Sequence, residues 1–211
     1  MYKRYVKRLL DIVLSALSLV VLSPLFVLLC IAIRLESKGS AFFKQQRVGR
    51  GKKLFDIYKF RTMRSDAPHD VPTNDLKHAD AYITKLGHVL RVTSLDELPQ
   101  LYNILKGDMS FIGPRPALWN QYELVALRDR YGANDVLPGL SGWAQVNGRD
   151  YLSRDLEKKA RRDGEYAQNL SFGFDAKCFW LTLVKVVNRQ GIVEGKETES
   201  YPVTGAKEDK A

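Results

Sequence analysis

The feature that most constrains this 211-residue chain is an apolar segment near its N-terminus. Residues 9–33 read LLDIVLSALSLVVLSPLFVLLCIAI. As a straight helix this segment would run about 37 Å, whereas the hydrocarbon core of a bilayer is about 30 Å thick. Its length therefore permits a membrane span. A cleaved signal peptide is disfavoured, because the apolar run is long for that role and lacks a small-x-small cleavage pattern.

Two features of the segment favour a helix that enters the membrane and returns to the same face. Pro24 removes a backbone N–H and kinks a helix, and the Ser23 hydroxyl can serve a carbonyl that the kink frees. Both flanks are basic, and a single crossing cannot place both on the positive-inside face. Because spanning helices tolerate proline, these residues leave a re-entrant hairpin and a kinked span about equally open. The flanking cations are Lys3, Arg4, Lys7 and Arg8 before the segment and Arg34, Lys38, Lys44, Arg47, Arg50, Lys52 and Lys53 after it.

The formal net charge of +9 favours anionic partners, which are nucleic acid, acidic lipid or phosphorylated substrates. The apolar segment puts a membrane first among these, and no nucleic-acid recognition motif is present. The two cysteines, Cys30 and Cys178, form no metal or redox spacing. The chain also lacks the glycine-rich loops of common nucleotide-binding folds.

The remaining sequence predicts an α+β fold that is mainly helical. A short β-hairpin is expected over residues 41–62, turning at residues 49–51. Helices are expected over residues 81–91, 98–106, 118–131, 151–169 and 175–189, with Gly107 as a C-cap and with residues 108–116 and 136–149 as connector and loop. The last helix is amphipathic, and its apolar face suits either a membrane interface or the protein's own core. The predicted organisation is a membrane hairpin (1–36), a cytoplasmic domain (37–195) and a polar tail (196–211).

Two adjacent carboxylates, Asp96 and Glu97, are the strongest candidates for chemistry. Ser94 and Glu97 have the spacing of a capping box, which is the simplest explanation of the pair. A functional explanation competes with it. An aspartate that a helix start keeps ionised can attack phosphorus or bind Mg²⁺, and the adjacent Glu97 can position a group or move a proton.

Several cations accompany this pair in the sequence. Lys59 and Arg61 alternate on the expected strand and so share a face. Arg91 lies five residues before Asp96, and Arg115 stands between two prolines that restrict its backbone, which suits a fixed phosphate contact. Each cation alone has the simpler explanation of a solvated charge. Together with the carboxylates and the apolar segment, they indicate phosphate chemistry at a membrane surface.

The ordered set of motifs resembles the bacterial sugar transferases, specifically the small monotopic phosphoglycosyl transferases. The resemblance runs over about residues 2–188 and is highly specific. Its carriers are Ser23-Pro24, KFRTM at 59–63, SLDELPQL at 94–101, LKGDMSFIGPRP at 105–116 and PGLSGWAQVNGR at 138–149.

The resemblance implies an enzyme that transfers a phosphosugar from a UDP-sugar to a polyprenyl phosphate, usually undecaprenyl phosphate, and releases UMP. This is the first membrane step of polysaccharide or other glycoconjugate assembly, and it requires Mg²⁺. Asp96 would be the nucleophile, carrying a covalent phosphosugar, and a metal ligand, with Glu97 in support. Lys59, Arg61, Arg91 and Arg115 would contact phosphate. The resemblance also favours the re-entrant hairpin, which places the protein on the cytoplasmic face of the inner membrane.

Further positions are expected to have a substrate or a structural role: Gly113, Pro114, Gln145, Asn147 and Arg149 in these motifs, and Asp163 and Asp175, which the resemblance matches to two later aspartates of the family. The match around Asp163 is loose. Two alternatives stay open, which are one-step transfer with Asp96 only as a metal ligand, and a non-catalytic adaptor that binds anionic lipid. The sequence identifies neither the sugar nor whether the chain forms a homo-oligomer.

Overall fold

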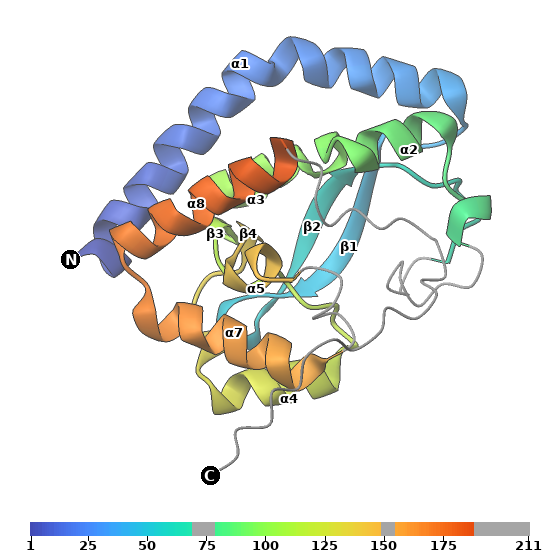
Figure 1. The fold of residues 1–211 in the computed structure, drawn as a ribbon. Coiled ribbons are helices and arrows are strands. Elements are labelled where there is room, and N and C mark those ends of the chain that lie inside the picture. The colour runs from blue at the N-terminus through green and yellow to red at the C-terminus, as the bar shows by residue number, and fades with distance from the viewer. Residues whose placement is uncertain (69–78, 149–154, 188–211) are drawn as a thin grey trace.

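In the computed structural model, which describes residues 1–68, 79–148 and 155–187, the apolar segment forms one bent helix, α1 (Lys7–Glu36). Figure 1 shows the bend part-way along the helix. Pro24 lacks the N–H that would reach the Val20 carbonyl four residues back, and the Ser23 hydroxyl donates to that carbonyl instead, at 2.8 Å. The predicted compensation by Ser23 is confirmed. Helical structure continues through the bend, so α1 is a bent helix and not two helices joined by a turn.

The faces of α1 are inverted relative to a helix of a water-soluble domain. Its buried side chains include Asp11 and Ser15, one turn apart, while most of its large apolar side chains are exposed. The Asp11 carboxylate accepts hydrogen bonds at 3.1 Å from the Ser110 hydroxyl and from the Phe111 backbone N–H. Among the described residues, α1 alone is long and apolar enough to cross a membrane. The exposed apolar residues of α1 include Leu9, Val13, Leu14, Leu17, Val20, Val21, Val27, Leu28, Ile31 and Leu35.

Polar contacts attach the N-terminal end of α1 to the rest of the protein. The Lys7 ammonium lies 2.6 Å from Asp175 Oδ2 and also donates to a backbone carbonyl. The Arg8 guanidinium donates to the carbonyls of Ile104 and Leu105, at 2.6 and 2.8 Å. These carbonyls belong to the last turn of a helix, where a cation is favoured by the helix dipole.

The C-terminal end of α1 is attached to the same body. The Arg61 guanidinium donates to the carbonyls of Ser37 and Lys38, at 2.6 and 2.9 Å, and so caps the end of the helix. Beneath it, Leu29 and Ile33 are buried in one cluster with Phe60 and Leu90. Both ends of α1 therefore contact one domain.

The expected β-hairpin is confirmed. Strands β1 (Phe42–Val48) and β2 (Leu54–Phe60) pair antiparallel, and Gly51 in the connecting turn has a φ of 63°, which glycine adopts without strain. A second pair, β3 (Ser110–Ile112) with β4 (Gly139–Ser141), is parallel. The sequence expectation of connector and loop in these two stretches is wrong, because each strand is only three residues long and its partner is distant in sequence.

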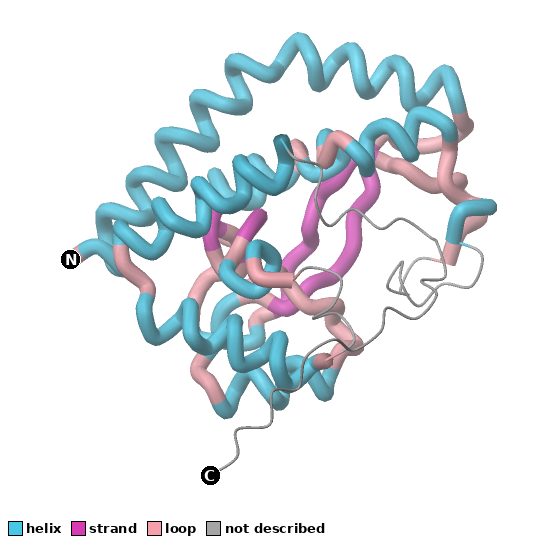
Figure 2. The backbone as a smooth tube through the Cα atoms, viewed as in Figure 1, coloured by secondary structure: helices cyan, strands magenta, loops and turns pink. Residues whose placement is uncertain are grey.

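The expected helices are present with shifted bounds. Gly107 ends α3 with a φ of 103°, as predicted for a C-cap. Helices α2 and α3 pack against α1, whereas α4 and α7 pack together beyond the end of β1 and β2 that is away from α1 (Figure 1; Figure 2). The elements besides α1 and the strands are η1 (Tyr2–Val6), η2 (Arg50–Lys52), η4 (Ala79–Ala81), α2 (Lys85–Val92), η5 (Leu95–Glu97), α3 (Gln100–Lys106), α4 (Tyr122–Arg130), η6 (Ala133–Asp135), α5 (Trp143–Val146), α7 (Leu156–Asn169) and α8 (Phe172–Val187).

Helix α8 presents its apolar face outward. Phe179, Trp180, Leu183 and Val184 are all exposed, so in the part of the chain that the structure describes no core covers this face. Of the two readings that the sequence left open, the exposed face agrees with the interfacial one. The predicted polar tail, residues 196–211, lies outside the described residues.

A buried ion pair joins α4 to α7. The Arg128 guanidinium donates to Asp163 Oδ2 from Nε and Nη2, at 2.9 and 2.5 Å, and both side chains are under 5% exposed, at 4% and 2%. Arg128 Nη2 also donates to the backbone carbonyl of Arg115, at 2.9 Å. The pair therefore fixes the position of the Arg115 backbone as well as the packing of two helices.

We predict that Arg128→Met lowers the free energy of unfolding by about 3–5 kcal/mol, because it leaves the Asp163 carboxylate buried without its counter-ion. The double variant Arg128→Met with Asp163→Leu removes both charges and should lose far less. Denaturant unfolding of the detergent-solubilised variants measures both. Equal losses in the single and double variants would contradict the ion-pair account.

Candidate active site

Asp96 and Glu97 lie on η5, a single 3₁₀ turn between α2 and α3. Ser94 before the turn has a left-handed backbone, with a φ of 57°, and its side chain makes no capping bond. The capping-box explanation of the pair is therefore wrong. Helix α3 begins only at Gln100, so the turn itself holds the two carboxylates in place.

The structure brings cations from two other elements to this pair. Glu97 Oε1 accepts from Lys59 Nζ of β2 at 2.8 Å and from Arg115 Nη2 at 2.7 Å. Lys59 Nζ also lies 3.8 Å from Asp96 Oδ2. One lysine thus serves both carboxylates, and Glu97 holds Lys59 and Arg115 beside Asp96.

Asp96 is buried, with 8% of the residue exposed. Its carboxylate accepts no hydrogen bond from the described residues, and Lys59 Nζ lies 3.8 Å away, so we call this carboxylate uncommitted. Burial raises the pKa of Asp96 above its usual range; Lys59 pulls that pKa down, Glu97 raises it, and Arg91 and Arg115 pull it down. The expectation that Asp96 lies at the start of an α-helix is wrong, because the residue lies on a 3₁₀ turn; the cations that lower its pKa offset burial only in part. The carboxylate lone pairs are available to an electrophile or a hard cation.

Arg115 is held in place by its backbone neighbours. The Gly113 N–H donates to the Ser141 carbonyl at 2.8 Å, and the Pro114 carbonyl accepts from the Gly139 N–H at 2.9 Å. A Cβ on Gly113 would lie 2.3 Å from the Leu137 carbonyl oxygen, so only glycine permits this approach. Gly113 and Pro114 thus dock the Arg115 segment against β4.

Arg91 approaches the pair from α2. Its Nε donates to the Thr62 hydroxyl at 2.9 Å, and its charge acts on Asp96. Arg61, in contrast, is turned away. The prediction that Lys59 and Arg61 share a face at the site is wrong, because β2 ends at Phe60 and the Arg61 guanidinium bonds to the end of α1.

The two later aspartates have internal partners. Asp163 is bound by Arg128, as described above. Asp175 accepts from the hydroxyls of Tyr2 and Tyr166, at 2.5 and 2.7 Å, in addition to Lys7. These contacts fit a structural role for both aspartates, one of the two roles that the sequence left open.

The glycine-rich motif near β4 also makes local contacts. The Gln145 amide donates to the Leu140 carbonyl at 3.2 Å, and the Asn147 amide donates to the Trp143 carbonyl at 2.8 Å. Arg149 lies outside the described residues.

Two cations near Arg115 were not predicted as site residues. Arg47 of β1 donates to the Pro116 carbonyl at 3.2 Å, and burial together with Arg115 lowers its pKa to about 10. Lys159 of α7 has its pKa lowered to about 8 by burial and by Arg128. Lys159 lies four residues before Asp163, so both are on one face of α7, and this spacing could have identified Lys159 from the sequence. For Arg47 the sequence indicates only a charge that flanks the apolar segment.

The donor set fits a magnesium ion that the substrate helps to bind. Among the described residues, no three Asp, Glu, His or Cys side chains are grouped to hold a metal. Mg²⁺, however, is commonly bound through one or two carboxylates and the phosphates of its substrate. The uncommitted carboxylate of Asp96 suits that arrangement, whereas Glu97 is held by Lys59 and Arg115.

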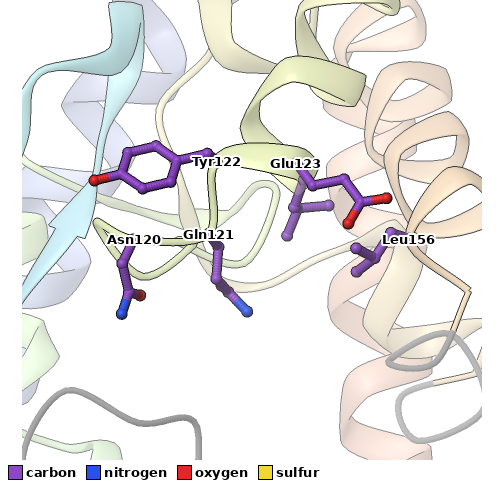
Figure 3. A pocket seen from close by; sticks show the side chains of 6 residues that line it. Asn120, Gln121, Tyr122, Glu123 and Leu156 are labelled. Atoms are coloured by element: carbon purple, nitrogen blue, oxygen red, sulfur yellow. The ribbon is translucent and has the colours of Figure 1, made fainter.

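A shallow hollow lies elsewhere, where the start of α4 faces the start of α7 (Figure 3). Among the described residues, Glu123 is the only charged one that lines the hollow, so the hollow does not suit a phosphate. None of the site residues described above takes part. The hollow is lined by Asn120, Gln121, Tyr122, Glu123, Leu124 and Leu156.

Comparisons with known proteins cover nearly the whole chain. Residues 2–189 match the family described as bacterial sugar transferase. The uncharacterized sugar transferase EpsL of Bacillus subtilis (strain 168) is 39% identical over 201 residues, which are 95% of this chain and 96% of that protein.

Larger relatives carry more specific names. A UDP-glucose:undecaprenyl-phosphate glucose-1-phosphate transferase of Escherichia coli (strain K12) is 40% identical over 188 residues, 86% of this chain but 40% of that protein. A UDP-N-acetylgalactosamine-undecaprenyl-phosphate N-acetylgalactosaminephosphotransferase of Aeromonas hydrophila is 36% identical over 193 residues, 89% of this chain and 45% of that protein. The chain thus spans less than half of either of these two relatives. By its family match and its similarity to EpsL along both chains, the protein belongs to the bacterial sugar transferases and is a transferase enzyme.

Proposed function

We propose that this protein transfers a phosphosugar from a UDP-sugar to undecaprenyl phosphate and releases UMP. The observation that carries the proposal is the Asp96 carboxylate, buried, without hydrogen-bond donors among the described residues, and set among Lys59, Arg91 and Arg115. A carboxylate in that setting is a nucleophile facing a site for phosphate oxygens. The names of the Escherichia coli and Aeromonas hydrophila relatives describe this type of reaction.

In the first step of the proposed reaction, an oxygen of Asp96 attacks the sugar-bearing phosphorus of the UDP-sugar. A bond forms between that oxygen and phosphorus, and the bond from phosphorus to the bridging oxygen breaks. UMP leaves with the electron pair of the broken bond. Lys59 and Arg115 offset the charge that spreads over the phosphoryl oxygens in the transition state.

In the second step, a phosphate oxygen of undecaprenyl phosphate attacks the same phosphorus. The bond between Asp96 and phosphorus breaks, which restores the carboxylate and yields the polyprenyl-diphosphate-linked sugar. The attacking phosphate is already deprotonated at neutral pH, so this step needs no general base. Glu97, bound to Lys59 and Arg115, is best understood as a residue that positions these two cations.

Magnesium belongs to the same proposal. Asp96 would hold the ion together with the diphosphate of the substrate, and the bound ion would neutralise part of the diphosphate charge. The small number of carboxylates at the site agrees with an ion that enters with its substrate.

We further propose that α1 dips into the cytoplasmic leaflet of the inner membrane and returns. Support comes from its two ends, which bond to the same domain through Lys7 and Arg8 at one end and through Arg61 at the other. A straight crossing would separate these ends by the thickness of the bilayer. The exposed apolar face of α8 would rest in the same interface.

We predict that Asp96→Asn abolishes UMP release, with a loss of about 10³-fold or more, because the amide cannot act as the nucleophile. The assay combines detergent-solubilised protein, Mg²⁺, a panel of UDP-sugars and undecaprenyl phosphate. Asp66→Asn, on an exposed acid paired with Arg64, is the matched control and should retain wild-type activity. An active Asp96→Asn variant would exclude Asp96 as the nucleophile.

The covalent step is tested without the lipid. Wild-type protein mixed with the donor sugar should release one equivalent of UMP and gain the mass of one phosphosugar, and Asp96→Asn should do neither. UMP release that requires the lipid, with no mass gain, would support one-step transfer with Asp96 as a metal ligand. If no donor releases UMP, the result would support the alternative of a non-catalytic adaptor that binds anionic lipid.

The topology predicts that both ends of α1 face the cytoplasm. Single cysteines at exposed Lys3 and Lys38, in a Cys30→Ala background, should react with a membrane-impermeant maleimide only in inside-out vesicles. The background protein without an added cysteine is the control for Cys178, which is buried. Labelling of the two positions from opposite faces would show a spanning helix.

A further inference from the structure

The cations of the candidate site continue beyond Arg115 in a row. Asp96 lies within the electrostatic reach of Lys59, Arg91 and Arg115, and Lys159 lies within reach of Arg115, Arg47 and Arg128. Arg115 belongs to both groups. Arg115, whose Nη2 lies 2.7 Å from Glu97 and whose carbonyl accepts from Arg128, therefore links the group around Asp96 on η5 to the group around Lys159 on α7, and we call the two groups together the row.

Arg47 is placed in this row by its backbone and side chain. Its backbone forms a bridge with Leu118, and its Nη1 donates to the Pro116 carbonyl, next to Arg115. Its Nη2 donates to Gln45 Oε1 at 2.6 Å, while its Nε is buried and has no partner among the described residues. A guanidinium carries five N–H donors, so Arg47 retains donors for a ligand.

Lys159 lies on the inward face of α7. The next residue, Ala160, is fully buried against Val48 and Ala117, which adjoin Arg47 and Pro116 in the chain. Asp163 follows one turn later on the same face and is occupied by Arg128. Among the described residues, no hydrogen bond or ion pair engages the Lys159 ammonium.

The far end of the row has an excess of positive charge. Arg47, Arg115, Arg128 and Lys159 lie together there. Glu97 acts on Arg47 and Arg115, Asp163 acts on Lys159, and Asp96 acts on Arg115. Glu97 is already bound to Lys59 and Arg115, Asp163 is bound to Arg128, and Asp96 is the proposed nucleophile. Partly buried cations without enough counter-ions are unfavourable, so an anionic ligand would stabilise this end.

We propose that Arg47, Arg115 and Lys159 bind the phosphate of the departing nucleoside monophosphate. This assignment rests on the proposed function, in which Asp96 attacks one phosphorus of a diphosphate. The second phosphorus of that diphosphate must lie beside the first, and the row extends from Asp96 through Arg115 toward Arg47 and Lys159. The three cations stabilise the negative charge that the leaving phosphate acquires when the bridging bond breaks.

The location of this end favours the nucleotide over the lipid as the source of the phosphate. The turn that carries Asp96 lies between α2 and α3, which pack on α1, whereas α7 lies beyond the end of β1 and β2 that is away from α1 (Figure 1; Figure 2). A lipid phosphate reaches the site from the side of α1. The nucleotide, which is soluble, can leave from the side of α7.

The test is the affinity for UMP, measured by calorimetry on the detergent-solubilised full chain. Lys159→Gln and Arg47→Gln should each weaken UMP binding about tenfold, as expected for the loss of one charge-assisted contact. Lys158→Gln and Arg50→Gln, on exposed residues next in α7 and in the turn after β1, are matched controls and should bind as the wild type does. Thermal unfolding of each variant, and rescue by Lys159→Arg, separates a lost contact from a misfolded protein.

A pH series gives a second readout. The phosphate of UMP carries two charges above a pH of about 6, so its own charge is constant between pH 7 and 9. Because the pKa of Lys159 is lowered to about 8, wild-type affinity should fall across this range, as the ammonium loses its proton. The charged groups that face Lys159 are Arg47 of β1, Arg115, Arg128 of α4 and Asp163 of α7. In Lys159→Arg the fall should disappear.

Three results would overturn the assignment. One is UMP affinity that is equal in the wild type, Lys159→Gln and Arg47→Gln. Another is a raised KM for undecaprenyl phosphate in these variants with unchanged UMP affinity, which would show that these cations bind the phosphate of the lipid. The third is a wild type that does not bind UMP. None of these decides the transferase reaction, which is judged separately by UMP release from UDP-sugars, and the binding assay needs no turnover.

Discussion

The structure depends on the attachment of both ends of one apolar helix to a single domain. At the first end, Lys7 and Arg8 are satisfied by Asp175 and by the last carbonyls of α3; at the second, Arg61 caps α1 itself. Each cation is removed from water, which costs free energy unless its donors are used. Because they are used, α1 is fixed along the domain, and it lies over α2 and α3, which flank the turn that carries Asp96.

The same residue types serve two purposes, and their partners distinguish them. Arg8 and Arg61 donate to helix-terminal carbonyls, which are neutral dipoles, and so complete the backbone. Lys59 and Arg115 share one carboxylate oxygen of Glu97. Two cations held so close would repel each other without that carboxylate. With Arg91, three cations face the two carboxylates of Asp96 and Glu97, which leaves the group net positive. A bound phosphate group would neutralise this excess charge. Arg8 and Arg61, which donate to backbone carbonyls, lie outside this group of charges.

What could be predicted from the sequence was local. Three predictions that depend on residues a few positions apart are confirmed. They are the hairpin of β1 and β2, the Gly107 C-cap, and the hydrogen bond from Ser23 to a carbonyl freed by Pro24. What the sequence left open or predicted wrongly involves distant partners. The role of Asp175 was open, and its partner Lys7 is 168 positions away; β3, which was expected to be a connector, pairs with β4 through glycines whose role needs both strands. The capping rule failed at Ser94 because its left-handed backbone turns the chain before the carboxylates.

Asp96 lies between two regions of opposite character. Toward α1 the neighbouring surface is apolar, and toward α7 the charges are cationic and only partly balanced by Glu97 and Asp163. A lipid phosphate and a soluble nucleotide would reach the carboxylate from these different sides. A covalent phosphosugar on Asp96 would let the nucleotide leave on one side before the lipid arrives on the other. In the two-step route the nucleotide and the lipid use the same phosphate contacts one after the other. One nucleophile is then sufficient, and the described residues of the site have a single uncommitted carboxylate, that of Asp96.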